Sequence, residues 1–169
     1  PVAIGSGVES ISLVQMGGMN TKNITEEHLM KVKPALWMSM IETAEIVAER
    51  YKVSRERQDE YALESQRRTA AAQQAQKFAD EIVPMQTKMK KVDKATGTET
   101  IVDAVVDKDE CNRPDTTLEG LQSLKPVFQG GQEVKVGKYI TAGNASQFSD
   151  GASAAVVMDG AVAAKRGIK

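Results

Sequence analysis

The stretch from Tyr139 to Met158 constrains the fold of this chain more than any other part of the sequence. Its first half is rich in glycine, alanine and serine, which place little bulk beside the main chain. Its second half, from Ala154 to Met158, is apolar and predicts a short buried strand. Such a loop either lets a ligand lie against the backbone or lets one element pack tightly on another. For the loop taken alone, close packing is the stronger interpretation.

Composition excludes several classes of protein. The chain has 169 residues, enough for one ordinary domain with a core, or one domain plus an excursion. Its formal net charge of -1 gives no strong field to attract nucleic acid or an acidic membrane. No apolar run approaches the roughly 20 residues of a membrane-spanning helix. We therefore predict no nucleic-acid partner and no membrane span. We also predict no metal site.

The sequence offers little support for either Cys111 as a nucleophile or His28 as a general base. Cys111 is the only cysteine, so no internal disulfide can form, which fits a reducing compartment. Its neighbours Asp109 and Glu110 disfavour the thiolate that a nucleophile requires, so we exclude a catalytic role. His28, the only histidine, lies in a short charged segment without a nearby partner and is expected to be solvated.

Periodicity and turn signals predict mixed helices and strands. Pro1 to Ile4 indicates a buried strand that enters a tight turn at Gly5-Ser-Gly7. The chain starts without methionine and ends just past an expected helix end at Gly167, so we expect both ends to continue in a longer protein. The other expected elements are a helix over 26–31 capped by Asn23 or Thr25, a helix from Glu42 to Tyr51, a helix from Arg55 to Gln76 capped by Ser54, a hairpin of 82–89 with 100–107, and a short helix begun by a capping box at Thr116 and Glu119.

Two surfaces of the predicted elements leave alternatives open. One small-residue face of the long helix should pack closely on another element, opposite a solvated charged face. The packing face is Tyr61, Ala62, Ser65, Thr69, Ala72 and Gln76, and the charged face is Glu56, Glu60, Glu64, Arg67 and Arg68. Arg113 lies just before the short helix, where it either binds a phosphate or pairs with Glu110 or Asp115 on the surface.

Ordered sequence blocks carry a resemblance to a known family. These blocks are Gly7-Val-Glu-Ser10, Glu42-Thr-Ala-Glu-Ile-Val-Ala48, Ser54-Arg55 with Gln58-Asp59 and Ser65-Gln66, Glu81-Ile-Val-Pro84, Arg113 with Thr117-Leu-Glu119 and Leu124-Lys-Pro-Val-Phe128, Thr141-Ala-Gly-Asn-Ala-Ser-Gln147, and Ser149-Asp-Gly-Ala152. Together they resemble the middle of a thiolase, a coenzyme-A-dependent acyltransferase. The order and spacing of the blocks, rather than any block alone, make the resemblance specific.

The resemblance implies an α/β fold with an α+β excursion: part of the first-half sheet of a thiolase with an inserted loop domain. Residues 1–12 would form a core strand and turn, residues 13–139 the loop domain with its helices and hairpin, and residues 140–169 the return to the core. Thiolases move an acyl group between a cysteine and coenzyme A, by thiolysis of a 3-ketoacyl-CoA or the reverse condensation. Their catalytic cysteines and histidine match no position of this chain, so none of its residues is expected to be catalytic.

The resemblance carries binding roles onto named positions. Ser146 matches the serine that meets the pantetheine arm, with Ala142 and Gly143 beside it. Arg113 matches an arginine near the nucleotide end, and Met40 a methionine near the acyl group. The channel positions are Leu124, Val127 and Phe128. Ser39 and Gly120 depart from some relatives, which leaves chain-length preference and part of the coenzyme A recognition open.

The same resemblance implies partners and a location. Acyl-CoA would be a substrate rather than a permanently bound cofactor, and the parent protein would be a homo-dimer or tetramer. The location would be the cytoplasm, or an organelle matrix in a eukaryote. The alternative is a non-catalytic CoA-binding or interaction module on the same scaffold.

Overall fold

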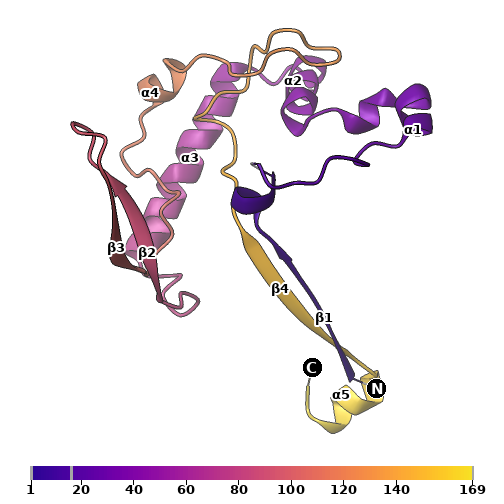
Figure 1. Cartoon of the computed structure of the whole chain (residues 1–169), viewed down its shortest axis with the longest axis vertical. Helices are drawn as coiled ribbons and strands as arrows, with labels where there is room; N and C mark the ends of the chain where they lie inside the picture. The colour runs from indigo at the N-terminus through magenta and orange to yellow at the C-terminus, as the bar shows by residue number, and fades with distance from the viewer. Residues whose placement is uncertain (1, 16, 169) are drawn as a thin grey trace. The chain divides into compact units, whose positions relative to one another are not determined.

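A computed structural model of the chain describes residues 2–15 and 17–168. It divides the chain into two compact units, one of Pro1–Trp37 with Ser146–Lys169, the other of Met38–Ala145. The strands form two separate antiparallel pairs, β1 with β4 and β2 with β3 (Figure 1). With helices in both units, the described chain has the mixed α/β character that was predicted, and that prediction is confirmed.

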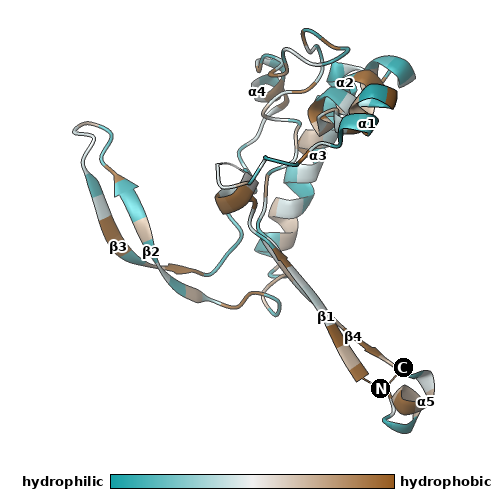
Figure 2. Cartoon of the chain, turned by 45° about the vertical axis from the view of Figure 1, so that its right-hand side comes forward, coloured by the Kyte–Doolittle hydropathy of each residue, from teal (hydrophilic) through white to brown (hydrophobic). Residues whose placement is uncertain are grey.

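The first unit contains a two-stranded ribbon. Strand β1 (Val2–Glu9) pairs with β4 (Gly151–Met158), so that Val2 faces Met158 and Glu9 faces Gly151. The predicted tight turn at Gly5–Gly7 is wrong, because these residues lie within β1 opposite Ala155 to Ser153. The predicted burial is also wrong. The hydropathy colouring in Figure 2 marks apolar residues along both strands. Their side chains are largely exposed, because among the described residues no other element packs extensively on the ribbon.

Asp150 closes the end of this ribbon beside a π-helical turn, η1 (Ile11–Gln15). Its carboxylate accepts the Ser12 backbone N–H at 3.0 Å, the Ser12 hydroxyl at 2.7 Å and the Ser10 hydroxyl at 3.1 Å. The hydroxyl and backbone N–H of Ser12, followed by Ser10, hold the pKa of Asp150 below its usual range. Asp150 therefore ties the start of β4 to the chain that leaves β1.

Three short helices complete the first unit. Helix α1 (Glu27–Val32) is capped by the Glu26 carboxylate, which accepts the backbone N–H groups of His28 and Leu29. The caps predicted at Asn23 or Thr25 are therefore wrong; a carboxylate at Glu26 reaches the same free N–H groups. A 3₁₀-helix, η2 (Pro34–Trp37), follows, and His28 is exposed as expected. Helix α5 (Gly160–Lys165) ends before Gly167, whose φ of 68° confirms the predicted helix end.

The second unit is built on α2 (Met40–Tyr51) and α3 (Arg55–Gln74). Ser39 caps α2, and Ser54 caps α3 as predicted, accepting the Arg57 N–H at 3.2 Å. The predicted hairpin is confirmed as β2 (Met85–Val92) with β3 (Glu99–Val106). Helix α4 (Leu118–Gln122) packs against α3.

Helix α4 begins one residue later than the predicted capping box. Thr117, not Thr116, is the cap, and its hydroxyl accepts the Gly120 N–H at 3.0 Å. The Thr116 hydroxyl instead donates to the Arg113 carbonyl at 2.7 Å, so it is used to hold the preceding turn. The predicted capping box is wrong because two adjacent threonines could each cap the helix, and it is the second, Thr117, that does so.

The predicted packing face of α3 is wrong at half of its positions: Tyr61, Ser65 and Gln76 are exposed, whereas Ala62, Thr69 and Ala72 are partly buried. Tyr61 is 74% exposed, whereas Asp59 is completely buried. The side chains that contact the chain downstream are polar: Arg55, Asp59, Gln66 and Gln73. The spacing of small residues did not predict these four contacts, because they are hydrogen bonds made by polar side chains and not close packing of small ones. The charged face was predicted correctly where Glu64 pairs with Arg67 and Arg68.

The interior of the second unit is unusually polar. Among the described residues, the fully buried apolar side chains are Ala48 and Leu121. The buried polar residues are Glu42, Glu45, Asp59 and Thr141. Buried carboxylates require partners, and all of these carboxylates point to the same downstream segment.

Candidate functional site

Residues 127–145, which we call the anchored loop, form the most highly constrained irregular segment of the chain. Apart from one bridge between Gln129 and Val136, the loop has no strand pairing. Its backbone N–H groups need acceptors because an unpaired buried N–H is costly. Two carboxylates of α2 accept several of these N–H groups, loop carbonyls accept others, and a carboxylate of α3 accepts the side-chain amide of Asn144.

Glu45 on α2 holds the middle of the anchored loop. Glu45 as a whole residue is 2% exposed. Its carboxylate accepts three consecutive backbone N–H groups. The distances are 2.8 Å from Lys138, 3.1 Å from Tyr139 and 2.8 Å from Ile140. One helix side chain therefore fixes the chain direction immediately before the glycine- and alanine-rich stretch.

Glu42, almost one helical turn earlier, holds the preceding part of the anchored loop. It accepts the N–H of Glu133 at 2.6 Å and of Val134 at 3.0 Å. Burial raises the pKa of Glu42, but the backbone N–H groups of Val134, Glu133 and Gln132 and the charge of Lys135 leave the pKa below its usual value. A Cβ on Gly131 would lie 2.5 Å from this carboxyl group, so the loop approaches the helix closely.

Asp59 on α3 anchors the end of the loop. This carboxylate is completely buried and accepts the Nε–H of Arg55 at 2.9 and 2.8 Å. It also accepts the Nδ2–H of Asn144 at 3.0 Å. The Arg55 Nη2 donates to the carbonyls of Leu121 at 2.8 Å and Leu124 at 3.0 Å. The pair therefore joins the end of α4 to the anchored loop.

Asn144 folds the loop back on itself. Its Oδ1 accepts the Thr141 N–H at 2.8 Å, and its Nδ2 also donates to the Tyr139 carbonyl at 2.9 Å. The Thr141 hydroxyl accepts the Gly143 N–H at 3.2 Å. A Cβ on Gly143 would lie 2.6 Å from side-chain atoms of Leu121 and Leu124. Glycine therefore permits a close approach to the end of α4, where a larger residue would displace the two leucine side chains.

The structure brings five of the eight predicted binding residues together. Val127 donates its N–H to the Ile140 carbonyl at 3.0 Å, and the Phe128 carbonyl accepts the Gly137 N–H at 2.9 Å. Gly143 lies against Leu124, and Ala142 is exposed beside it. The five residues are Leu124, Val127, Phe128, Ala142 and Gly143. The Leu124–Gly143 contact and the hydrogen bond from Val127 to Ile140 place residues 124–128 beside residues 140–143 in the second unit.

The other three predicted binding residues, Met40, Arg113 and Ser146, are not part of this cluster. Met40 is the first residue of α2 and is 86% exposed. Arg113 is exposed, and its backbone N–H donates to Gln66 Oε1 at 2.8 Å; the ion pairs among the described residues do not include its guanidinium. Ser146 follows the loop directly but belongs to the first unit, where its hydroxyl donates to the Gln147 carbonyl at 3.2 Å.

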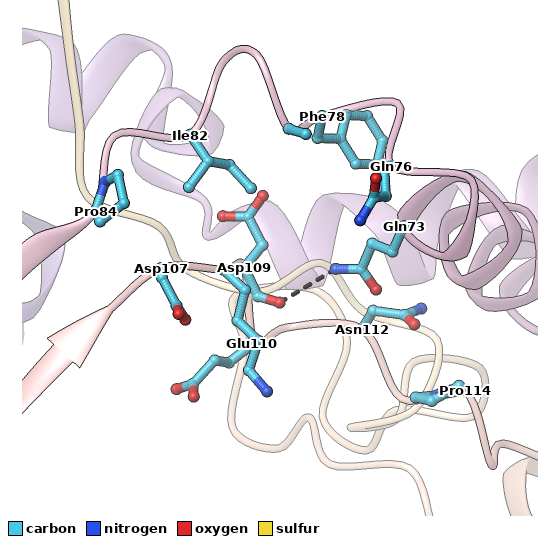
Figure 3. A pocket seen from close by; sticks show the side chains of 12 residues that line it. Gln73, Gln76, Phe78, Ile82, Pro84, Asp107, Asp109, Glu110, Asn112 and Pro114 are labelled. Atoms are coloured by element: carbon cyan, nitrogen blue, oxygen red, sulfur yellow. Dashed lines mark hydrogen bonds between the residues drawn. The ribbon is translucent and has the colours of Figure 1, made fainter.

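A separate groove of about 640 Å³ lies between the end of α3 and the base of the hairpin. Figure 3 shows Phe78 and Ile82 on one wall and Asp109 and Glu110 on the other. Gln73 donates to the Asp109 carbonyl at 3.2 Å across it. None of the eight predicted binding residues lines this groove. Its acidic wall would repel a phosphate-bearing ligand.

Sequence reasoning missed the anchoring residues. Glu42, Glu45 and Asp59 stand in helices where charges usually face solvent. One signal was available, because Glu42 and Glu45 share a helical face with the apolar Ala48. A second was the spacing of Arg55 and Asp59, which are four residues apart and form an ion pair across one helical turn.

Neither a metal site nor a membrane helix is found in the described part of the chain. In residues 2–15 and 17–168, no group of three or more ligand-type side chains is placed to hold a metal ion. No helix within these residues has the length and hydrophobicity to cross a membrane. Cys111 is exposed and free.

Comparisons with known proteins agree on one family. A family model described as "Thiolase, N-terminal domain" matches residues 1–161. The peroxisomal 3-ketoacyl-CoA thiolase 2 of Arabidopsis thaliana is 41% identical over 99% of this chain and 34% of its own length. The human peroxisomal 3-ketoacyl-CoA thiolase is 44% identical over 90% of this chain and 33% of its own length.

Solved structures show the same likeness. The dimeric peroxisomal thiolase of Saccharomyces cerevisiae matches with a TM-score of 0.68 and 30% identity, over 99% of this chain and 38% of that one. Human mitochondrial 3-ketoacyl-CoA thiolase in complex with CoA matches with a TM-score of 0.64 and 33% identity, over 99% of this chain and 40% of that one. The chain thus spans about a third of the length of the curated relatives it matches.

Proposed function

Because the chain belongs to the thiolase family, through its N-terminal domain, we propose that it is part of an acyl-CoA C-acyltransferase and supplies coenzyme A contacts. The whole protein would move an acyl group between a cysteine and coenzyme A, either by thiolysis of a 3-ketoacyl-CoA or by the reverse condensation. The residues of this chain would bind and orient the substrate rather than form bonds with it.

The anchored loop is the observation that supports this proposal. Without a ligand, buried carboxylates already accept its backbone N–H groups and the side-chain amide of Asn144, while Ala142 remains exposed. A preformed surface loses less conformational freedom on binding and so retains more affinity. Because Ala142 has only a methyl side chain and Gly143 has none, an extended pantetheine arm could lie against the main chain there.

We assign the remaining contacts on the same basis. Ser146, directly after the anchored loop, would hydrogen-bond the pantetheine arm, and the exposed guanidinium of Arg113 would meet the nucleotide phosphates. Leu124, Val127 and Phe128 would line the channel, since Leu124 and Val127 are 37% and 54% exposed. Met40 would contribute near the acyl group, where a flexible thioether adapts to different shapes.

Further proposals concern assembly, location and division of the chain. We propose a homo-dimer or tetramer, supported by a relative described as dimeric, and a site in the cytoplasm or an organelle matrix, supported by relatives named as peroxisomal. We retain the division into residues 1–12, 13–139 and 140–169 as a proposal. The alternative of a non-catalytic CoA-binding module would share the same contacts.

Calorimetric titration of the full-length protein with coenzyme A tests the binding proposal. Ser146→Ala should weaken binding by about fivefold through loss of one hydrogen bond. Arg113→Ala should weaken it by about tenfold or more through loss of a charge-assisted contact. The matched controls are Ser149→Ala and Arg67→Ala, which should leave affinity unchanged. Absence of coenzyme A binding by the parent, or equal affinity in all variants, would overturn the proposal.

A further inference from the structure

We propose that Arg55, Asp59 and Asn144 form a positioning relay that fixes the spacing between two ligand-facing segments. The segments are residues 121–128, which carry the proposed channel residues, and residues 139–145, which carry Ala142 and Gly143. This inference rests on the proposed function for its effect on coenzyme A. The relay residues themselves would not touch the ligand.

Arg55 supplies the first half of the relay. Its guanidinium is shared between a buried carboxylate and the backbone: Nε donates to Asp59, while Nη2 donates to the carbonyls of Leu121 and Leu124. The side chain is only 17% exposed. A planar guanidinium makes these contacts in a fixed geometry, whereas a lysine ammonium on a flexible stem does not. The end of α4 is thereby set relative to α3.

Asn144 supplies the second half. Its Nδ2 donates both to Asp59 and to the Tyr139 carbonyl, and its Oδ1 accepts the Thr141 N–H. An aspartate at this position could still accept from Thr141 but could not donate to the other two oxygens. It would also place a second carboxylate about 3 Å from the buried one, judged from the present 3.0 Å contact. The amide is therefore required chemically, not only sterically.

The relay links segments that otherwise have little to hold them in register. The described residues record one direct backbone hydrogen bond between them, from the Val127 N–H to the Ile140 carbonyl at 3.0 Å. A Cβ on Gly143 would lie 2.6 Å from methyl groups of Leu121 and Leu124, so the two segments are in close contact there. Misplacement by about 1 Å at a site can cost about 100-fold in activity.

The test uses the full-length protein with Arg55→Lys and Asn144→Asp. We expect about tenfold weaker coenzyme A binding in each. Amide hydrogen exchange should become faster in residues 121–128 and 139–145, and less so elsewhere. The control is Ala71→Gly, an exposed position within α3 that lowers helix stability through propensity alone and should keep the parent affinity. Arg55→Lys is the milder variant and serves if Asn144→Asp fails to fold.

Two outcomes would overturn the relay. In the first, Ala71→Gly and Arg55→Lys lower the melting temperature equally and also weaken coenzyme A binding equally. That result would show a general effect of stability on affinity. The other is unchanged exchange in both segments of Arg55→Lys, or faster exchange with unchanged affinity. If the parent binds no coenzyme A, the proposed function fails separately, and exchange in the two segments still decides whether the relay positions them.

Discussion

The anchored loop and the β1–β4 ribbon differ in two properties: how regular their secondary structure is, and how many buried contacts hold them in place. The loop lacks regular secondary structure, yet carboxylates of Glu42, Glu45 and Asp59 hold it along its length. The ribbon has a full antiparallel ladder, yet its side chains are almost all exposed. A two-stranded pair is at best marginally stable alone. Of these two regions, the irregular loop therefore has the greater support from buried, hydrogen-bonded polar groups.

The difference matters for function because binding surfaces benefit from preorganisation. A segment whose backbone N–H groups are bonded to buried charges cannot rearrange without leaving donors unpaired. The ribbon gains little from hydrophobic burial within its own unit, so its apolar residues contribute little to stability there. The predictions below aim at this contrast, from the largest effect to the smallest.

Glu45→Ala should cause the largest loss of stability. It removes the acceptor of three consecutive N–H groups, at Lys138, Tyr139 and Ile140. Unpaired buried donors cost about 1–3 kcal/mol each before water relieves them, so we expect a total near 3 kcal/mol. Urea unfolding measures the change. Glu60→Ala on α3 is the control: the Glu60 side chain is 52% exposed and pairs with Arg57 of its own helix, so this variant should lose less. Equal losses would contradict the anchoring account.

A pair of glycine substitutions should separate the two regions. Gly143→Ala should destabilise by about 1–3 kcal/mol, because the new Cβ meets Leu121 and Leu124 at 2.6 Å. Gly7→Ala in the ribbon should change stability by less than about 1 kcal/mol, since nothing lies within 4 Å of the added Cβ. Thermal unfolding of both variants checks the contrast. A larger effect at Gly7 would reverse it.

The pH dependence of Asp150 should be the smallest effect. Its pKa is lowered in the folded chain by the Ser12 hydroxyl and backbone N–H. Its contribution is therefore complete above the ordinary carboxyl pKa of about 3.9 and disappears as pH falls through the lower folded value. Asp150→Asn should melt slightly earlier than the parent near neutral pH, with the gap closing as the pH falls below the ordinary carboxyl pKa and Asp150 becomes protonated. A gap independent of pH would exclude this carboxylate as its source.

Much of the local structure was predictable because the relevant signals are local. Ser54 as the cap of α3, the hairpin and the helix end at Gly167 all follow from a few neighbouring residues. The same reasoning failed at Gly5–Gly7, since glycine in a turn and glycine in an exposed strand look alike in sequence. It also placed the cap of α4 one residue early, at Thr116.

The site was predictable only in part, since its supports act over long distances. Leu124, Val127, Phe128, Ala142 and Gly143 came from ordered family blocks, and the structure places them together. The contacts of Glu45 span more than ninety residues of sequence, so periodicity could not identify its partners. A buried charge on a helix also has the same local pattern as a solvated one. Only the folded chain distinguishes the two.

Hydrogen exchange of the full-length protein with and without coenzyme A tests the central claim most directly. The claim is that residues 124–128 and 139–145 of the second unit bind coenzyme A. The account predicts slower amide exchange in both segments on binding, with no change in the hairpin strands β2 and β3. Protection confined to the acidic groove at residues 107–112 and the end of α3, without change in those two segments, would contradict it.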